Sequence, residues 1–368
     1  MKKYILYGVG AEAEYFLCAN LSIYKEIAFC IDANRTGSFH GIPIYSFDDA
    51  PLSSDYKILV TPRWDVYTEI CTFLESKGLH EFSDFIWTRY YKRKIVIINA
   101  NCHGNYLRDY LNSSVQFKEK YFLAVVPPIN ENKNGKISDV LLHNCDIYIH
   151  QDIQAKNEFS YYLSDEYTIP KLKTDCKIIT IPNLVGFGNW LYPMMGKLLY
   201  NTSTNRPCAY ENFILEEAYS IGLRRISDIE SYYMNYNYDS DMLTSLFEKS
   251  IKKMRERELH WNIKISDFIL ENYKNRLLLI DRAHPHIPLA SYFCNAVAKM
   301  LNITDAKFNL ENTGVSAPYP PSVRNHFALS YEYDYKYIYT INGQTISCFA
   351  DYVKYYFWMT HDIILEDD

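Results

Sequence analysis

The chain has 368 residues, of which 48% are hydrophobic and 22% charged, which is typical of a folded rather than a disordered protein. Its net charge of −6 argues against a general nucleic-acid binder and against a polybasic membrane patch. No apolar run approaches the ~20 residues that span a bilayer, so no transmembrane segment is expected. The length favours two domains over a single core.

The first 92 residues are predicted to form a small α/β domain with a parallel sheet. Strands are expected over 4–7, 27–31 and 57–60, and helices over 12–21 and 66–77. Gly8-x-Gly10-x-x-Ala13, with Asp32 about 20 residues further on, matches the dinucleotide-binding fingerprint in form. The glycines permit a tight turn, and the helix N-terminus offers amides to a phosphate. Gly8, Gly10 and Asp32 are therefore the candidate cofactor-binding residues.

This segment also resembles the N-terminal domain of sugar-modifying enzymes, in which a Gly-x-Gly turn is followed by a strand ending in Asp and by a Gly-x-Pro-Ile stretch. Here that stretch is Gly41-Ile42-Pro43-Ile44. The resemblance implies a nucleotide-sugar ligand at this domain, or no ligand.

A second α/β domain is predicted over 93–320, after a basic, exposed linker at 90–94. Its strands are expected over 95–98, 121–126, 147–149, 177–181 and 277–280, and its helices over 106–111 and 288–301. Residues 207–275 lack a strand pattern and contain a helix behind Asp239, so they are interpreted as a helical insertion and a candidate lid. Residues 321–368 are predicted to be a C-terminal extension packed on this domain, with a hairpin of 335–339 and 345–348 across Asn342-Gly343.

The nine cysteines contain no CxxC pair, and no metal site is predicted. Their odd, unpatterned number is typical of reduced thiols, and the first apolar stretch is too short for a signal peptide. These features predict a cytoplasmic protein. The sequence leaves the oligomeric state open, with a homo-oligomer among the alternatives.

Polar residues follow the predicted strands of the second domain. Ligands of open parallel sheets bind beyond the carboxyl ends of the strands, so these residues are expected to share one edge. They are Asn101, Cys102, His103, Asn130, His150, Gln151, Asp152, Asn183, Asp281 and His284.

Cys102 is the candidate nucleophile of this edge, because a strand-to-helix turn places a thiolate at a helix N-terminus. His284 is the candidate base, and Asp281 would fix its tautomer. His103 and His286 are the rival acid–base groups, and Asp152 is the rival for the orienting carboxylate. The backbone amides after Cys102 are candidate oxyanion donors, together with Asn101, Gln151 and Asn183.

The second domain resembles the WcbI-like family of polysaccharide biosynthesis proteins, which are viewed as capsule acetyltransferases. The matching stretches include Asn99-Ala100-Asn101-Cys102-His103 and His284-Pro285, with further matches at 146–152, 179–184 and 263–269. The layout also resembles the SGNH hydrolase fold, in which Asp-x-x-His precedes the last helix. Two positions depart from these patterns: the WcbI-like family usually has glutamine where this chain has His103, and the SGNH nucleophile is a serine where this chain has Cys102.

The resemblance implies an O-acetyltransferase that moves an acetyl group from acetyl-CoA to a sugar hydroxyl in capsular or other surface polysaccharide biosynthesis. His284 would deprotonate either Cys102, in a two-step route, or the acceptor hydroxyl directly. Arg108, Arg224 and Arg225 are candidate contacts for the coenzyme A phosphates. The alternatives are a carbohydrate esterase or deacetylase with the same site, and a non-catalytic nucleotide-sugar-binding component of an assembly complex.

Overall fold

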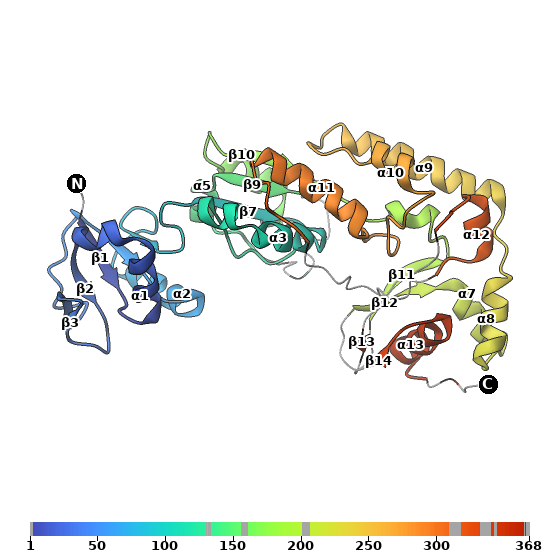
Figure 1. Cartoon of the computed structure of the whole chain (residues 1–368), viewed down its shortest axis with the longest axis horizontal. Coiled ribbons are helices and arrows are strands. Elements are labelled where there is room, and N and C mark those ends of the chain that lie inside the picture. The colour runs from blue at the N-terminus through green and yellow to red at the C-terminus, as the bar shows by residue number, and fades with distance from the viewer. Residues whose placement is uncertain are drawn as a thin grey trace.

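The chain contains two larger β-sheets, one with six strands and one with four, and helices cover both of them (Figure 1). The computed structural model describes residues 3–129, 131, 134–155, 161–200, 207–308, 318–331, 340–341, 344–363 and 365. The six-stranded sheet lies toward the N-terminal end of the molecule, and the four-stranded sheet lies in the middle (Figure 1). None of the helices within these described residues is long and apolar enough to cross a membrane.

The six-stranded sheet has the strand order β3-β4-β2-β1-β5-β6, and all neighbouring strands are parallel except β3 and β4. Ile5 and Leu6 of β1 point to opposite faces of this sheet and enter different core clusters. Helix α2 contributes to the first cluster and α1 to the second, so both faces of the sheet are buried. The elements are β1 (Lys3–Tyr7), α1 (Ala11–Ala19), β2 (Ile27–Ile31), β3 (Gly37–Phe39), β4 (Ile42–Tyr45), β5 (Tyr56–Val60), α2 (Trp64–Ser76) and β6 (Phe85–Trp87).

The four-stranded sheet is entirely parallel, in the order β10-β9-β7-β8. Its central strand β7 (Lys94–Asn99) buries both faces: Val96 and Ile98 enter one cluster, and Ile95 and Ile97 enter the other. This explains the uninterrupted apolar run. The other strands and flanking helices are β8 (Tyr121–Leu123), β9 (Ile147–His150), β10 (Lys177–Thr180), α3 (His103–Ser113), α4 (Val115–Lys120), α5 (Asp139–His143), α6 (Asp165–Thr168) and α11 (Ile287–Met300).

The two sheets share one hydrophobic cluster. The prediction of an exposed linker over residues 90–94 is therefore wrong at Tyr90. Tyr90 is only 4% exposed. The centre of its ring lies 5.0 Å from that of Phe122 on β8, and the ring of Trp87 on β6 lies 5.4 Å from the same side chain. Aromatic burial therefore joins the last strand of the first sheet to the second sheet, while Lys92 and Lys94 are exposed.

The fifth strand expected at 277–280 does not join the sheet. The backbone of Ile280 donates to His284 O at 3.0 Å, and His286 donates to Leu278 O at 2.8 Å, so this segment pairs with its own return. The edge of β10 is taken instead by Asn262, which accepts from Thr180 N at 2.7 Å and donates to Thr180 O at 3.2 Å. The apolar residues 278–280 are buried, and they lead into a tight turn formed by residues 281–284.

The predicted helical insertion begins with a strand that the sequence did not indicate. Strands β11 (Met195–Tyr200) and β12 (Pro207–Asn212) pair antiparallel. The sequence did not indicate β12 because it lacks the apolar alternation by which a strand is recognised. Asp239 caps the longest helix of the insertion by accepting from Met242 N at 2.7 Å, as expected. The helices are α7 (Phe213–Ser220), α8 (Ile226–Met234), α9 (Ser240–Glu258) and α10 (Ser266–Asn272).

The C-terminal segment adds α12 (Pro321–His326) and α13 (Phe349–His361). The hydroxyl of Tyr356 on α13 accepts from Asn212 N at 2.9 Å, which fixes this helix against the end of β12. A short antiparallel pair, β13 (Thr340–Ile341) and β14 (Gln344–Thr345), lies where the hairpin was expected. Residues 335–339 and 342–343 of that prediction lie outside the described residues, and 346–348 are not a strand.

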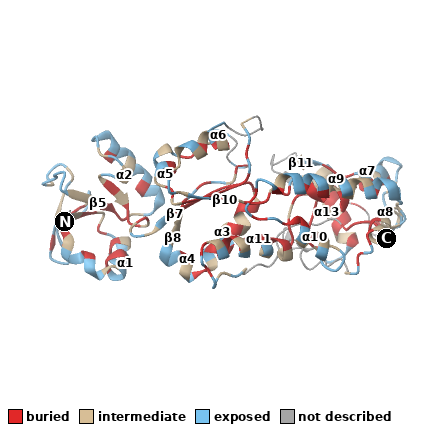
Figure 2. Ribbon diagram, turned by 90° about the horizontal axis from the view of Figure 1, so that it is seen from above, coloured by how far each residue is buried: buried red, intermediate tan, exposed pale blue. Residues whose placement is uncertain are grey.

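Burial follows this arrangement along the molecule. Buried residues are concentrated in β5 and β7, whereas the outer side of α9 is exposed (Figure 2). The carboxyl ends of the four parallel strands share one edge, and this edge faces the turn at 281–284.

Candidate active site

Cys102, His284 and Asp281 meet in one hydrogen-bonded line at the carboxyl edge of the four-stranded sheet. Cys102 follows β7 and is the N-cap residue of α3, at the helix end that stabilises negative charge. Its Sγ lies 3.0 Å from His284 Nε2. On the other side of the ring, His284 Nδ1 lies 2.8 Å from Asp281 Oδ2. The two segments, about 180 residues apart in sequence, thus form a thiol–imidazole–carboxylate arrangement.

The carboxylate of Asp281 also shapes the turn that carries His284. Its Oδ1 accepts from the backbone amides of Ala283 at 2.7 Å and of His284 at 2.8 Å. One oxygen therefore fixes the backbone while the other holds the ring. Asp281 is 6% exposed, which limits competition from water for these bonds.

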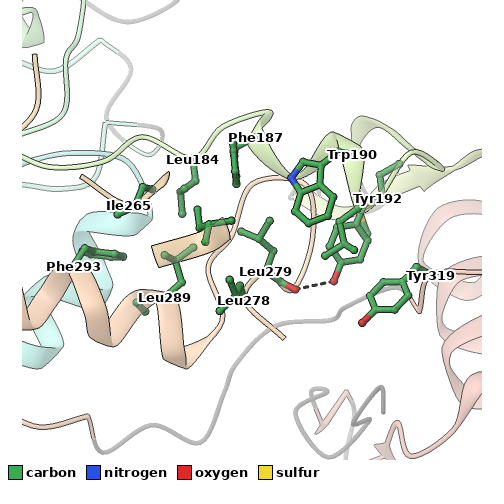
Figure 3. Packing of buried hydrophobic residues seen from close by; sticks show 14 of the residues in the cluster. Leu184, Phe187, Trp190, Tyr192, Ile265, Leu278, Leu279, Leu289, Phe293 and Tyr319 are labelled. Carbon is green, nitrogen blue, oxygen red and sulfur yellow. Dashed lines mark hydrogen bonds between the residues drawn. The ribbon is translucent and has the colours of Figure 1, made fainter. Parts of the chain in front are cut away.

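Four contacts from other elements hold the turn in place. Tyr192 donates its hydroxyl to Leu279 O at 2.7 Å, within the apolar packing that Figure 3 shows. Gly188 N donates to Arg282 O at 2.8 Å, and the Arg282 guanidinium donates to Gly196 O at the start of β11. His103 Nε2 donates to Ala283 O at 2.8 Å. A turn fixed at so many points holds His284 in one orientation before any substrate binds.

Gly188 is in closest contact with this turn. A Cβ added at this residue would lie 2.7 Å from Asp281 O and 2.8 Å from Arg282 Cα, and backbone atoms cannot move aside as a side chain can. We expect Gly188→Ala to displace the turn and to lower activity at least about 10-fold, because small misplacements of catalytic groups are costly. Steady-state kinetics measure the loss.

The matched control for this substitution is Gly10→Ala, where a Cβ would meet nothing within 4 Å and φ is negative. It should leave both activity and thermal stability close to wild type. Equal activity of the Gly188→Ala variant and the wild type would show that the turn tolerates displacement.

His103 is held neutral and does not fit the role of a rival acid–base group. The residue is 1% exposed. Its Nε2 donates to a carbonyl, so Nδ1 is the acceptor, and Gln151 Nε2 donates to it at 3.1 Å. Burial, reinforced by the nearby charge of His284, lowers the pKa of His103 to about 3. With both nitrogens engaged, the ring fixes the turn and has no proton to exchange near neutral pH.

Gln151 and Asn101 are also committed to this buried network. Gln151 is fully buried; besides its bond to His103, it donates to Pro182 O at 2.8 Å and accepts from Asn101 N at 3.0 Å. Asn101 Oδ1 accepts from His103 N at 2.9 Å. Gln151 therefore has no donor left for an oxyanion, and the amide that follows Cys102 is occupied as well. The expectation of an oxyanion donor is therefore corrected for Gln151 and for the amide that follows Cys102, which support the backbone that positions Cys102, whereas for the side-chain amide of Asn101 it stays a prediction.

Other candidate donors at this sheet edge are the backbone amide of Cys102 and the side chain of Asn183. Within the described residues, the backbone N–H of Cys102 itself has no acceptor, so it is free to face a developing oxyanion. Asn183, the third expected donor, follows β10 and is half-buried, and its Oδ1 accepts from Val185 N at 3.1 Å. That bond leaves the amide group of Asn183 available.

The pKa of His284 is raised from its ordinary value of 6.5 to about 11. Burial by itself disfavours the charged ring, but the Asp281 carboxylate and the bond to Cys102 outweigh it. The imidazole therefore holds its proton throughout the neutral range. A raised pKa stabilises the fold fully below the ordinary value, and the stabilisation is lost as the pH rises through about 11.

Replacing Asp281 by asparagine should lower the pKa of His284 from about 11 toward its ordinary value of 6.5, because the main favourable charge is removed. Asparagine keeps an acceptor for the two turn amides, so the turn should persist. A histidine-selective NMR titration measures the shift, with the His284 signal assigned from a His284→Ala sample. Asp152→Asn, which removes the exposed rival carboxylate, should leave the titration unchanged. The same titration midpoint in the Asp281→Asn and wild-type proteins would contradict this account.

The remaining histidines of this region have other surroundings than His284. His286 is buried at the N-cap of α11, and the ring at the Cys102 thiol is that of His284. His150 is buried with Nδ1 2.9 Å from Asp165 and Nε2 3.1 Å from Thr180. Asn130 lies outside the described residues.

Tyr210 and Arg282 belong to the site but were missed by the sequence analysis. Burial raises the pKa of the Tyr210 phenol, and the nearby charges of Asp281 and Cys102 raise it further, so the hydroxyl stays protonated. The Arg282 guanidinium carbon lies 5.8 Å from the Tyr210 ring centre. No sequence signal pointed to Tyr210, because β12 itself was not recognised. Arg282 lies inside the Asp-x-x-His motif, where its anchoring bond to β11 could not be foreseen.

Arg108, Arg224 and Arg225, the three candidate contacts for the coenzyme A phosphates, all have partners within the protein. Arg108 donates to Val126 O at 2.7 Å, and burial lowers the pKa of its guanidinium. Arg224 donates to Leu223 O at 2.8 Å and stacks on the Tyr219 ring. Arg225 pairs with Asp228. Each of these bonds uses only part of a guanidinium, and the expected contact of the three arginines with coenzyme A stays a prediction.

In the glycine turn of the first sheet, the hydrogen-bonding groups also have partners within the chain. Gly8 has a φ of +89°, and a Cβ there would lie 3.0 Å from the Pro62 and Thr61 side chains, so glycine is required. Asp32 Oδ2 accepts from Val9 N at 3.0 Å, and its Oδ1 accepts from Asn34 N at 2.9 Å. The carboxylate therefore caps the turn, and nothing within 4 Å would meet a Cβ at Gly10.

An α/β fold with a thiol, an imidazole and a carboxylate aligned at a sheet edge has the layout of an enzyme that acts through a cysteine. The family model of the polysaccharide biosynthesis enzyme WcbI matches residues 95–306. The match covers more than half of the 368 residues and all three members of the site, and the chain belongs to the WcbI family.

One solved structure is also similar. It is described as native WcbI, a novel polysaccharide biosynthesis enzyme, without a disulfide bond between coenzyme A and one of its cysteines. It shares 15% sequence identity with this chain and has a TM-score of 0.43; the alignment covers 59% of this chain and 74% of that one. No curated protein shows significant similarity to the chain.

Proposed function

We propose that the chain is an O-acetyltransferase that moves an acetyl group from acetyl-CoA to a sugar hydroxyl during the synthesis of a capsular or other surface polysaccharide. The observation that carries the proposal is the line from Cys102 Sγ through His284 to Asp281, with distances of 3.0 and 2.8 Å. Membership of a polysaccharide biosynthesis family supports a sugar as the acceptor. Residues 93–320 then act as a catalytic domain with an SGNH-like layout.

The reaction proceeds in two steps in this proposal. The Cys102 thiolate attacks the thioester carbonyl, the backbone N–H of Cys102 donates to the oxyanion, and His284 gives its proton to the departing thiolate of coenzyme A. A sugar hydroxyl then gives its proton to His284 and attacks the acetyl group on Cys102. Release of the ester restores the thiolate and the imidazolium, so atoms and protons balance over the cycle.

The raised pKa of His284 supports this order of events. An imidazole that already carries a proton is a ready acid for the first departing group, and Asp281 keeps that proton on the ring. The same ring becomes a base only after it has given its proton away. This alternation is what a two-step transfer requires.

The test is acetyl transfer by the purified full chain, with acetyl-CoA as donor and a panel of sugars as acceptors, followed by mass spectrometry of sugar and protein. We expect an acetylated sugar, and an acetylated Cys102 when the acceptor is omitted. Rapid hydrolysis of a chromogenic acetyl ester, with no dependence on acetyl-CoA, would favour the esterase alternative instead.

A further inference from the structure

A groove with a row of positive charges lies between α9 and the segment that follows β10. Its volume is about 180 Å³. Lys249, Lys253 and Arg257 line it from α9, and Val185, Phe187 and Asn189 line it from the opposite side.

The three cations are placed on one face of α9 at a spacing of four residues. Each step of four rises ~6 Å, so the row is ~12 Å long, which is more than one phosphate group needs. Like charges at this spacing destabilise a helix, so the row does not serve folding. Lys249 and Lys253 are exposed and form no ion pair with any residue that the structure describes.

Arg257 extends the row inward toward the sheet edge. Burial lowers the pKa of its guanidinium, and the charge of Asp152 opposes this effect. Its only hydrogen bond within the described residues is a donation from Nη1 to Asn183 O at 3.2 Å. A half-buried guanidinium with most of its donors unused has the properties of an anion contact.

The groove and the candidate active site share a wall. Asn183, whose carbonyl Arg257 contacts, follows β10 at the same sheet edge as Cys102. A few residues later, Gly188 packs against the backbone of Asp281 and Arg282. The segment from Asn183 to Gly188 therefore borders the groove on one side and supports the turn with His284 on the other.

We infer that this groove binds the phosphate groups of coenzyme A, with Lys249, Lys253 and Arg257 as their contacts. The inference rests on the proposed function, which supplies a donor with a diphosphate and a further phosphate. Phe187 and Met254 give the groove an apolar floor for the uncharged parts of the donor. The diphosphate of a nucleotide-sugar has the same chemistry, so the test separates the two sources.

The test measures binding of coenzyme A and of a UDP-sugar, by calorimetry, to the full chain and to two variants. In the double variant Lys249→Ala/Lys253→Ala we expect coenzyme A to bind about 10-fold more weakly or worse, because charge-assisted contacts are lost. Lys252→Ala, on the same helix but outside the groove, is the matched control and should bind as wild type does. Wild-type affinity should also fall as salt rises.

A phosphate-free thioester, S-acetyl-N-acetylcysteamine, separates this inference from the proposed function. The double variant should transfer its acetyl group as fast as wild type does. Unchanged coenzyme A affinity in the double variant would overturn the groove assignment, whatever the catalytic result. If the double variant binds the UDP-sugar more weakly than wild type does but binds coenzyme A equally well, coenzyme A is not the occupant of the groove. No transfer from either thioester by wild type, with normal coenzyme A binding, would overturn the proposed function while leaving the groove assigned.

Discussion

Replacing His284 by alanine should abolish acetyl transfer, with a loss in kcat of about 10³-fold or more. In the proposed mechanism this ring protonates the first departing group and deprotonates the acceptor, so neither step keeps its proton carrier. The loss is severe because the ring that contacts both the Cys102 thiol and the Asp281 carboxylate is the one that is removed. The measurement is the rate of sugar acetylation under saturating donor and acceptor.

A structural explanation of that loss is excluded by two further measurements. Added imidazole should restore part of the activity of the His284→Ala variant, since it can occupy the vacated space and carry the proton. His286→Asn, which replaces the rival ring with a residue suited to an N-cap, should keep most of the activity. Full activity in the His284→Ala variant, or a comparable loss in the His286→Asn variant, would contradict the assignment.

Replacing Cys102 by alanine should also remove transfer almost completely, by about 10³-fold, because no acetyl-enzyme can form. The helix N-terminus and the imidazole remain in this variant, so the loss reports on the sulfur. Intact-protein mass spectrometry should show an added acetyl group in wild type and none in the variant. Cys18→Ala, which removes an exposed thiol elsewhere, is the control and should behave as wild type.

The outcome for Cys102 decides between the two routes that the sequence left open. If the Cys102→Ala variant transfers acetyl groups at the full rate, His284 acts directly on the acceptor hydroxyl and the two-step route is wrong. Kinetics with both substrates varied give an independent answer: parallel lines in double-reciprocal plots are expected for a covalent intermediate, and intersecting lines for direct transfer. The prediction for His284 holds in either case, since both routes need its proton transfer.

Two expectations from the polar residues of the sheet edge were altered by local packing. Gln151 is fully buried with all of its hydrogen bonds inside the protein, so a residue chosen as an oxyanion donor is instead a support for Cys102. His103, which departs from the family pattern, is neutral and bonded through both nitrogens. Residue type and position indicated that both residues belong to this region, but only the direction of each donor shows its role.

The apolar patterns of the sequence determined most of the two larger sheets and their flanking helices. Strands such as β2 and β7 were predictable because apolar runs in parallel sheets bury both faces, and that requirement is local. The edge position of Cys102 followed from the same rule, since it comes directly after β7. Asp281 and His284 were singled out by their spacing, although the strand assigned before them is a self-paired turn.

Only the tertiary structure decided how that turn meets the thiol. The contact between Cys102 and His284 depends on Tyr192, Gly188 and Arg282, which hold the turn from segments that carry no catalytic motif. It also places Tyr210 and Arg257 beside the same edge. Local patterns fix which residues are buried and which elements form, whereas hydrogen-bond directions and charge environments depend on partners far away in the chain, and no single segment specifies them.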